Sequence, residues 1–194
     1  WCYIGQGVVE QVKNEFGAEI EWLPFLLRPN MPEAGEDIPA YIKAKKSQTG
    51  DRLRQLAEMQ NLPMVTSTWL SNTRLAHEAT EYARERGKGT EFHRVVFRLY
   101  YGEDKDIGRW DILRLAATIT GLDPDDMQKS VSDGQYRAIV DDQLADAQSL
   151  GISSVPTYVL NDRYAIVGAQ PMAVFKQVIE RLQTDANNSE TDLA

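Results

Sequence analysis

The chain has 194 residues, 42% of them hydrophobic, and its 21 Lys and Arg against 29 Asp and Glu give a net charge of −8. The length fits one domain, either of ordinary size or small with a large insertion, and the acidic balance argues against nucleic acid or an anionic membrane as the main partner. A single cysteine and two histidines exclude an internal disulfide framework and a zinc site of several thiolates, so we expect no bound metal. The longest apolar runs have the length of strands, so no transmembrane helix is predicted.

The first part of the chain predicts a helix followed by a strand. Apolar residues at helical spacing indicate a helix over residues 6–16, which ends at Gly17. Residues 19–27, with the sequence EIEWLPFLL, are rich in β-branched and aromatic residues and predict a strand, which Pro24 limits to a sheet edge in its second half. Residues 28–37 contain two prolines and a glycine and predict a loop.

The middle of the chain, from residue 38 to about residue 150, is helical in its pattern throughout. Asp123 followed by Pro124 is typical of a helix start, with Asp as the N-cap and Pro at the first helical position. Helices are also predicted over residues 38–47 and 51–60 on either side of Gly50, 73–86, 92–101, 110–120 and 132–150.

The last part of the chain changes to the pattern of a hairpin and one helix. Residues 156–160 and 164–167 predict two short strands around an Asn161-Asp162 turn, and a helix is predicted over residues 172–183. Residues 184–194 form a polar tail that we expect to be frayed. One strand and a hairpin are too few to bury both faces of a sheet, so we expect a first strand upstream of Trp1 and a natural chain that begins earlier.

Two residues could carry chemistry, each with an ordinary alternative. Cys2 stands at the start of the first helix, where free N–H groups and the helix dipole favour a thiolate, although most lone cysteines are small buried apolar residues. Pro156 precedes a strand, where most prolines are trans; a cis bond after Val155 would instead present the backbone of Val155 to a partner.

These residues lie within stretches that resemble the DsbA-like thioredoxin-fold proteins, specifically the FrnE-type branch. The N-terminal Trp1-Cys2-Tyr3-Ile4-Gly5 resembles the second half of that family's C-P-W-C-Y-I-G stretch. Further matches are residues 19–32, 71–77, 151–157 and 164–171, which resemble the second strand with its loop, the N-T-x-x-A-H segment, the cis-proline strand and the G-A-Q-P turn. The similarity extends to about Leu182.

The resemblance implies an α/β fold in which a thioredoxin-like domain is interrupted by a large all-helical insertion. It places the first part of that domain at residues 1–35, the helical insertion at 36–150, the second part at 151–183 and the polar tail at 184–194. By position in the family motif, Cys2 would be the resolving cysteine of a Cys-x-x-Cys and Pro156 the cis proline. Trp1 would tune the redox potential, and the backbone of Val155 would dock the substrate. The nucleophilic cysteine would lie two residues before Trp1.

Three residues of the helical block belong to the same resemblance. Asn72, Thr73 and His77 would face the active-site groove and contact a thiol substrate, and His77 could shift a thiol pKa by its charge. The alternative is structural: Asn72 or Thr73 caps a helix, and His77 is a partly buried helix residue. His93 stands among apolar residues and is interpreted as structural.

The resemblance favours a thiol–disulfide oxidoreductase that acts on protein or small-molecule thiols and disulfides, glutathione among them. It implies no metal, flavin or nicotinamide cofactor, and the few cysteines favour a cytoplasmic location. Two alternatives stay open: a glutathione-dependent isomerase or transferase of the same superfamily, and a non-catalytic peptide-binding or holdase module beside Pro156. The oligomeric state is not predicted.

Overall fold

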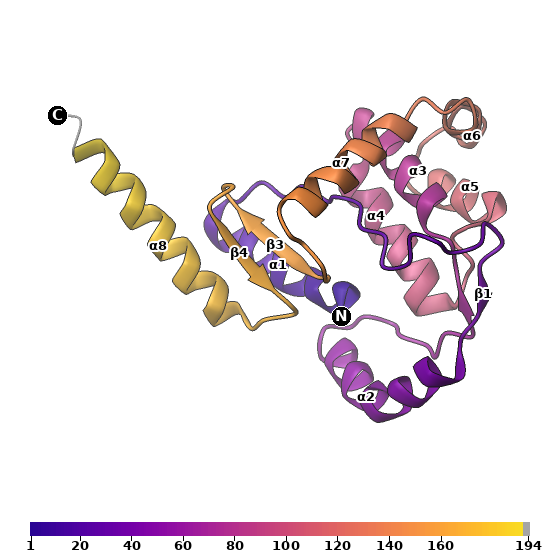
Figure 1. Cartoon of the computed structure of the whole chain (residues 1–194), viewed down its shortest axis with the longest axis horizontal. Helices are drawn as coiled ribbons and strands as arrows, with labels where there is room; N and C mark the ends of the chain where they lie inside the picture. Colours follow the sequence, from indigo (N-terminus) through magenta and orange to yellow (C-terminus); the bar gives the residue numbers. More distant parts are fainter. Residues whose placement is uncertain (192–194) are drawn as a thin grey trace. The chain divides into compact units, whose positions relative to one another are not determined.

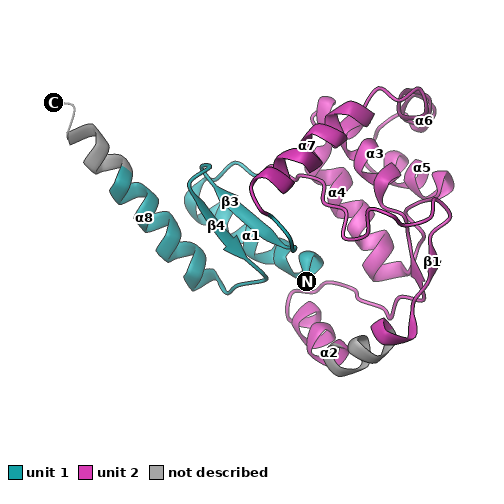
Figure 2. Cartoon of the chain, in the orientation of Figure 1, with its two compact units in different colours: residues 1–20, 152–194 teal, residues 21–151 magenta. Residues whose placement is uncertain are grey.

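The chain divides into two compact units, which Figure 2 shows in two colours. The computed structural model describes residues 1–191, without the side chains of residues 43–49 and 186–191. Unit 1 comprises Trp1–Ile20 and Ile152–Ala194, and unit 2 comprises Glu21–Gly151. Unit 1 is thus assembled from the two ends of the chain, with the whole of unit 2 inserted between them.

Unit 1 consists of two helices and a hairpin, labelled in Figure 1. Its elements are α1 (Cys2–Phe16), β3 (Thr157–Leu160), β4 (Tyr164–Val167) and α8 (Met172–Thr191). The two strands are antiparallel, with Tyr158 opposite Ile166. Helix α1 ends as predicted at Gly17, whose φ of 65° is the left-handed conformation that glycine adopts without a Cβ penalty.

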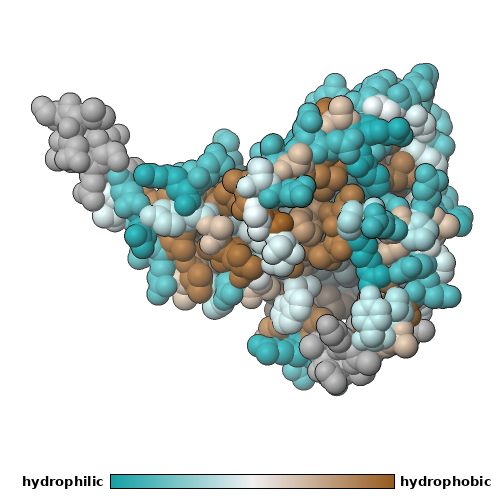
Figure 3. Space-filling view, in the orientation of Figure 1, coloured by the Kyte–Doolittle hydropathy of each residue, from teal (hydrophilic) through white to brown (hydrophobic). Residues whose placement is uncertain are grey.

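The core of unit 1 lies between the hairpin and both helices. Val12, Ile166 and Phe175 are its buried centre. Because side chains alternate along a strand, Tyr158 and Leu160 pack with this core while Val159 and Val167 are exposed on the other face. Hydrophobic residues accordingly show at the surface over the hairpin in Figure 3.

Unit 2 is a helical unit with one very short pair of strands. The strands, β1 (Glu36–Asp37) and β2 (Trp69–Leu70), are antiparallel. Its helices are α2 (Ala40–Met59), α3 (Arg74–Glu85), α4 (Gly89–Phe97), the π-helix η1 (Arg98–Gly102), α5 (Trp110–Ile119), α6 (Pro124–Ser132) and α7 (Arg137–Ser149). Residues of α3 to α6, such as Ala79, Phe92 and Leu113, are fully buried at its centre. Over residues 1–191, no helix combines the length and the apolar character needed to cross a membrane.

Several predicted boundaries are confirmed for a local chemical reason. The Asp123 side chain accepts hydrogen bonds from the backbone N–H groups of Asp125 and Asp126 and so caps α6, as expected from Asp followed by Pro. The hairpin strands also lie within the predicted ranges, joined by Asn161 and Asp162, whose φ values of 49° and 53° suit these two residue types.

The predicted strand over residues 19–27 is wrong, because these residues have no strand beside them among the described elements. The segment is instead held by helix α3: the Arg84 guanidinium pairs with Glu21 at 2.6 Å and donates to the backbone carbonyl of Trp22. This attachment explains why unit 2 begins at Glu21 rather than at the expected residue 36.

Three helix predictions also need correction. The expected break at Gly50 does not occur and α2 is continuous, because a single glycine costs a helix only about 1 kcal/mol. The predicted helix over 132–150 begins only at Arg137, after a turn in which Gly134 has a φ of 78°. Helix α8 continues through the expected tail to Thr191, and Tyr164 donates a hydrogen bond to Asp185 on it at 2.7 Å. Residues 192–194 of that tail lie outside the described residues.

Candidate functional site

Cys2 and Pro156 are brought together at one end of unit 1. Cys2 occupies the first turn of α1, and Gly5 lies one turn further along the same helix face. A Cβ atom built on Gly5 would lie 3.8 Å from Cγ of Pro156 and 2.3 Å from the hydroxyl oxygen of Tyr158. The start of the hairpin therefore packs directly on the first turn of α1, beside Cys2.

The Cys2 thiol is half-buried, and its burial raises the pKa of the thiol above its ordinary value. A backbone hydrogen bond acts in the opposite direction, but its effect is smaller. The expectation that the helix start alone favours a thiolate is therefore wrong, because desolvation outweighs it. Cys2 is a sheltered thiol, and Trp1 beside it is exposed.

The Val155–Pro156 peptide bond is cis. The carbonyl of Pro156 accepts a hydrogen bond of 2.8 Å from the backbone N–H of Gly168, which ties the start of β3 to the end of β4. The backbone of Val155 has no backbone hydrogen bond within residues 1–191. An extended peptide could therefore hydrogen bond to this backbone as an added strand.

Tyr158 is part of the site and was not identified from the sequence. Its ring packs edge-to-face on Phe175, with ring centroids 4.9 Å apart, while its hydroxyl reaches Gly5. Burial, and to a smaller extent the charge of the nearby Cys2 thiolate, raises the pKa of Tyr158 to about 12. Alternation along β3 indicated that this residue faces the core, but only the packing against α1 shows that its polar end reaches the cysteine turn.

The predicted site residues Asn72, Thr73 and His77 belong to unit 2. Asn72 is a structural residue there: its side-chain amide donates to the carbonyl of Met31 at 2.8 Å, and its side-chain oxygen accepts from the N–H of Arg74 at 2.9 Å. Thr73 is the N-cap of α3 by position, although its side chain makes no capping hydrogen bond. Asn72 thus joins a loop to the start of a helix.

His77 and His93 are neutral at pH 7. Burial lowers the pKa of His77 from 6.5 to about 4 and that of His93 to about 3, and each buried Nε2 atom lacks a hydrogen-bond partner within the described part of the chain. A neutral imidazole supplies no charge to a thiol, so the suggested electrostatic role of His77 is not supported. The described residues contain no group of three His, Cys, Asp or Glu side chains that could hold a metal ion.

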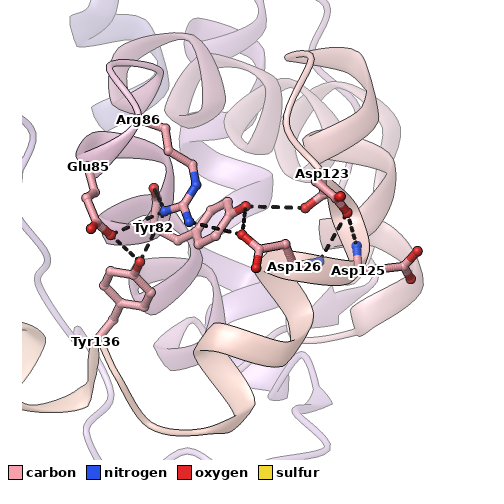
Figure 4. Close-up of polar contacts among 7 residues, drawn as sticks. All are labelled: Tyr82, Glu85, Arg86, Asp123, Asp125, Asp126 and Tyr136. Atoms are coloured by element: carbon pink, nitrogen blue, oxygen red, sulfur yellow. Dashed lines mark hydrogen bonds and ion pairs between the residues drawn. The ribbon is translucent and has the colours of Figure 1, made fainter.

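A second cluster of ionisable groups joins α3, α6 and the start of α7, as Figure 4 shows. The Arg86 guanidinium lies 3.6 Å from the centre of the Tyr82 ring and 3.0 Å from the carboxylate of Asp126, which also accepts a 2.8 Å hydrogen bond from the Tyr82 hydroxyl. Tyr136 donates to Glu85 and accepts from Arg86. Each of these side chains makes a hydrogen bond or ion pair with another member of the cluster. This arrangement is typical of groups that stabilise a fold rather than of a reactive site.

The close approach at Gly5 leads to a stability prediction. Gly5→Ala should reduce the free energy of unfolding of unit 1 by about 1–3 kcal/mol, because the added Cβ forces the Tyr158 ring off Phe175. Gly50→Ala is the matched control, since a Cβ there has no described neighbour within 4 Å and a helix gains up to about 1 kcal/mol from alanine. Chemical denaturation followed by circular dichroism measures both. Equal effects of the two substitutions would contradict the packing described at Gly5.

Comparison with known proteins agrees with this arrangement. The family model described as a DSBA-like thioredoxin domain matches residues 1–180. The uncharacterized protein YwbO of Bacillus subtilis (strain 168) is 30% identical over 184 residues, which cover 92% of this chain and 90% of that protein. The match therefore extends over nearly the whole length of both proteins.

Solved structures show the same fold. The crystal structure of a probable DsbA oxidoreductase, SCO1869 of Streptomyces coelicolor, superposes with a TM-score of 0.84 at 25% identity, over 93% of this chain and 84% of that one. A 2-hydroxychromene-2-carboxylate isomerase has a TM-score of 0.76 at 17% identity, over 100% and 93% of the two chains. A putative protein disulfide isomerase of Nitrosomonas europaea has a TM-score of 0.72 at 15% identity, over 95% and 92%.

The fold is therefore a thioredoxin-like domain with a helical insertion, as expected from the resemblance. The neighbour at 25% identity is described as a probable DsbA oxidoreductase, which supports an enzyme at a coarse level. From the family match over residues 1–180 and the packing of a cis proline beside a cysteine helix, the chain belongs to the DSBA-like thioredoxin domain family.

Proposed function

We propose that this protein is a thiol–disulfide oxidoreductase of the FrnE type, in which Cys2 is the resolving cysteine. The nucleophilic cysteine of the pair would precede Trp1 by two residues in the natural protein. The observation that carries the proposal is the packing of Pro156 against Gly5, which lies one turn of α1 from Cys2.

The reaction has two exchange steps. The thiolate of the first cysteine attacks a substrate disulfide, forms a mixed disulfide and releases one substrate thiolate. The Cys2 thiolate then attacks the sulfur of the first cysteine, which forms the disulfide within the protein and releases the second substrate thiolate. Two electrons pass from the protein to the substrate, and the protons lost by the two cysteines are taken up by the released thiolates. Oxidation of a substrate is the same sequence in reverse.

The environment of Cys2 suits the second step. A resolving thiol must stay protonated until the mixed disulfide forms, and the burial that raises its pKa has this effect. The unpaired backbone of Val155 suits the first step, because a peptide bound beside Pro156 as an extended strand would hold its disulfide near the start of α1. This mode of binding depends on the backbone, and it is compatible with substrates of varied sequence.

The proposal is tested on the natural protein by intact mass after alkylation, with and without prior reduction. We expect two alkylated thiols that appear only after reduction, and turnover of a model protein disulfide that falls at least about 100-fold in Cys2→Ser, because the mixed disulfide can no longer be resolved. A serine substitution keeps the side-chain size, so circular dichroism should show an unchanged fold.

Two other outcomes would overturn the proposal. A single thiol that reduction does not change, with saturable binding of glutathione, would favour the isomerase or transferase alternative. Suppression of aggregation that survives Cys2→Ser, without any disulfide turnover, would favour a peptide-binding module at the exposed apolar face of the hairpin formed by Val159 and Val167.

A further inference from the structure

The hydroxyl of Tyr158 lies against the turn of α1 that carries Cys2. Cys2 and Gly5 are three residues apart on a helix and so share one face. The hydroxyl occupies the space where any other residue at position 5 would place its Cβ, at 2.3 Å from that point. Glycine at position 5 therefore makes room for a phenol group beside the thiol.

The ring of Tyr158 is held in this position from the opposite side. Its edge-to-face contact with Phe175 on α8 belongs to the core of unit 1, which also contains Val12 and Ile166. Because the ring is fixed by this packing, the hydroxyl stays close to the helix start rather than turning to solvent. No hydrogen bond of the Tyr158 hydroxyl occurs within the described residues, so its proton is available to a neighbouring sulfur.

We propose that Tyr158 is a positioning residue for Cys2, to which its hydroxyl donates a hydrogen bond when the thiol is ionised. This role rests on the proposed function, in which Cys2 must become a thiolate to resolve a mixed disulfide.

The chemistry of the phenol makes it a donor and not a base at this site. Its pKa of about 12 keeps it protonated over the range in which a thiol ionises. The negative charge of an ionised Cys2 disfavours ionisation of the Tyr158 hydroxyl. A protonated hydroxyl that donates to the sulfur would in turn stabilise the Cys2 thiolate. Tyr158 keeps its proton throughout, and the proton lost by Cys2 leaves with the released substrate thiol.

A hydrogen bond of this kind would offset part of the burial that raises the thiol pKa. A backbone hydrogen bond at Cys2 also lowers the thiol pKa. It is unchanged by substitutions on β3, so a comparison of variants in the same chain isolates the phenol.

The experiment is the pH dependence of alkylation of Cys2 in the natural protein, read on the peptide that contains Cys2 so that any other cysteine is followed separately. In Tyr158→Phe we expect the pKa of Cys2 to rise by about one pH unit, since a hydrogen bond to a charged group is lost while the ring packing on Phe175 is kept. At pH 7 the alkylation rate should fall about tenfold. Tyr164→Phe is the matched control: it removes a hydroxyl from the same hairpin, bonded to Asp185, and should leave the Cys2 pKa unchanged.

A second variant separates the hydrogen bond from general packing. Gly5→Ala displaces the hydroxyl and should raise the Cys2 pKa in the wild-type background, but far less in Tyr158→Phe, where no hydroxyl is present. An unchanged pKa in Tyr158→Phe, or an equal rise in Tyr164→Phe, would overturn the proposal. Neither result depends on disulfide turnover, so failure of this inference is distinguishable from failure of the proposed function.

Discussion

Lowering the pH from about 7.5 to about 5 should reduce the free energy of unfolding of unit 2 by about 2 kcal/mol for each of His77 and His93. The imidazole of His93 is stacked between Trp22 and Phe97, with ring centroids 4.0 Å from each. His77 makes a hydrogen bond with the backbone of Phe25, and Arg74 nearby disfavours a positive charge on it. Both side chains are therefore held in surroundings that suit a neutral ring.

The direction of this pH effect depends on whether the folded or the unfolded protein binds protons first as the pH falls. The pKa values of about 4 and about 3 in the folded protein lie below the ordinary value of 6.5, so the unfolded chain takes up protons first as the pH falls. The stabilisation is fully present above pH 6.5 and is lost as the pH falls toward the folded values. The effect is large because two histidines are affected in one cluster.

The measurement is chemical unfolding at a series of pH values, followed by tryptophan fluorescence. Trp22, Trp69 and Trp110 lie in unit 2, so the signal reports mainly on that unit. His93→Phe is the informative variant, because a phenyl ring can stack in the same place and does not titrate. We expect it to halve the pH dependence in this range. An unchanged dependence would show that His93 has the same pKa in the folded and unfolded protein, and would contradict the lowered pKa.

Replacing Arg84 by methionine should destabilise unit 2 by about 3 kcal/mol at neutral pH, because it leaves a carboxylate without its partner in a buried position. The guanidinium lies 3.0 Å from the carboxylate of Glu81, whose side chain is only 6% exposed, and it also holds Glu21 and the backbone of Trp22. Burial raises the pKa of Glu81, and Arg84 is the main group that opposes this. The same substitution releases the segment after Ile20 from helix α3.

Two comparisons make this prediction specific. Since Glu81 can take up a proton at low pH, the loss in Arg84→Met should be smaller at pH 5 than at pH 8, measured against the wild-type protein at each pH. The double substitution with Glu81→Met should regain much of the lost stability, because it leaves no unpaired charge. Lys129→Met is the control for charge removal at the surface, because its pair with Asp133 is exposed and should contribute far less than a buried pair. A loss in Arg84→Met no larger than in this control would contradict the buried pair.

The sequence predicted correctly those features that depend only on residues close together in the chain. The cap at Asp123, the glycine end of α1 and the Asn161-Asp162 hairpin depend on residues within four positions of one another, and the structure confirms them. The failed predictions depended on distant partners. Residues 19–27 have the composition of a strand, but a strand forms only beside another one, and here the segment is bound to Arg84 on α3 instead.

The same distinction applies to the residues of the candidate site. Cys2 and Pro156 were identified from the sequence because their residue types and the motifs around them are distinctive. The motif also suggested Asn72 and His77, but it carries no information about burial; the structure shows that Asn72 is used within the scaffold and that His77 is uncharged. Tyr158 belongs to no recognised motif, and only its contact with Gly5 in the folded structure places it at the site.

By itself, the sequence determined the helical character of the chain, its hairpin, its family and the cysteine and proline on which the proposed chemistry depends. These follow from periodicity, capping and motif, which are properties of neighbouring residues. Only the tertiary structure decided which segments share a unit, that burial rather than the helix dipole controls the thiol of Cys2, and that a phenol lies beside it. Desolvation and close packing depend on atoms brought together from opposite ends of the chain, and no local pattern records them.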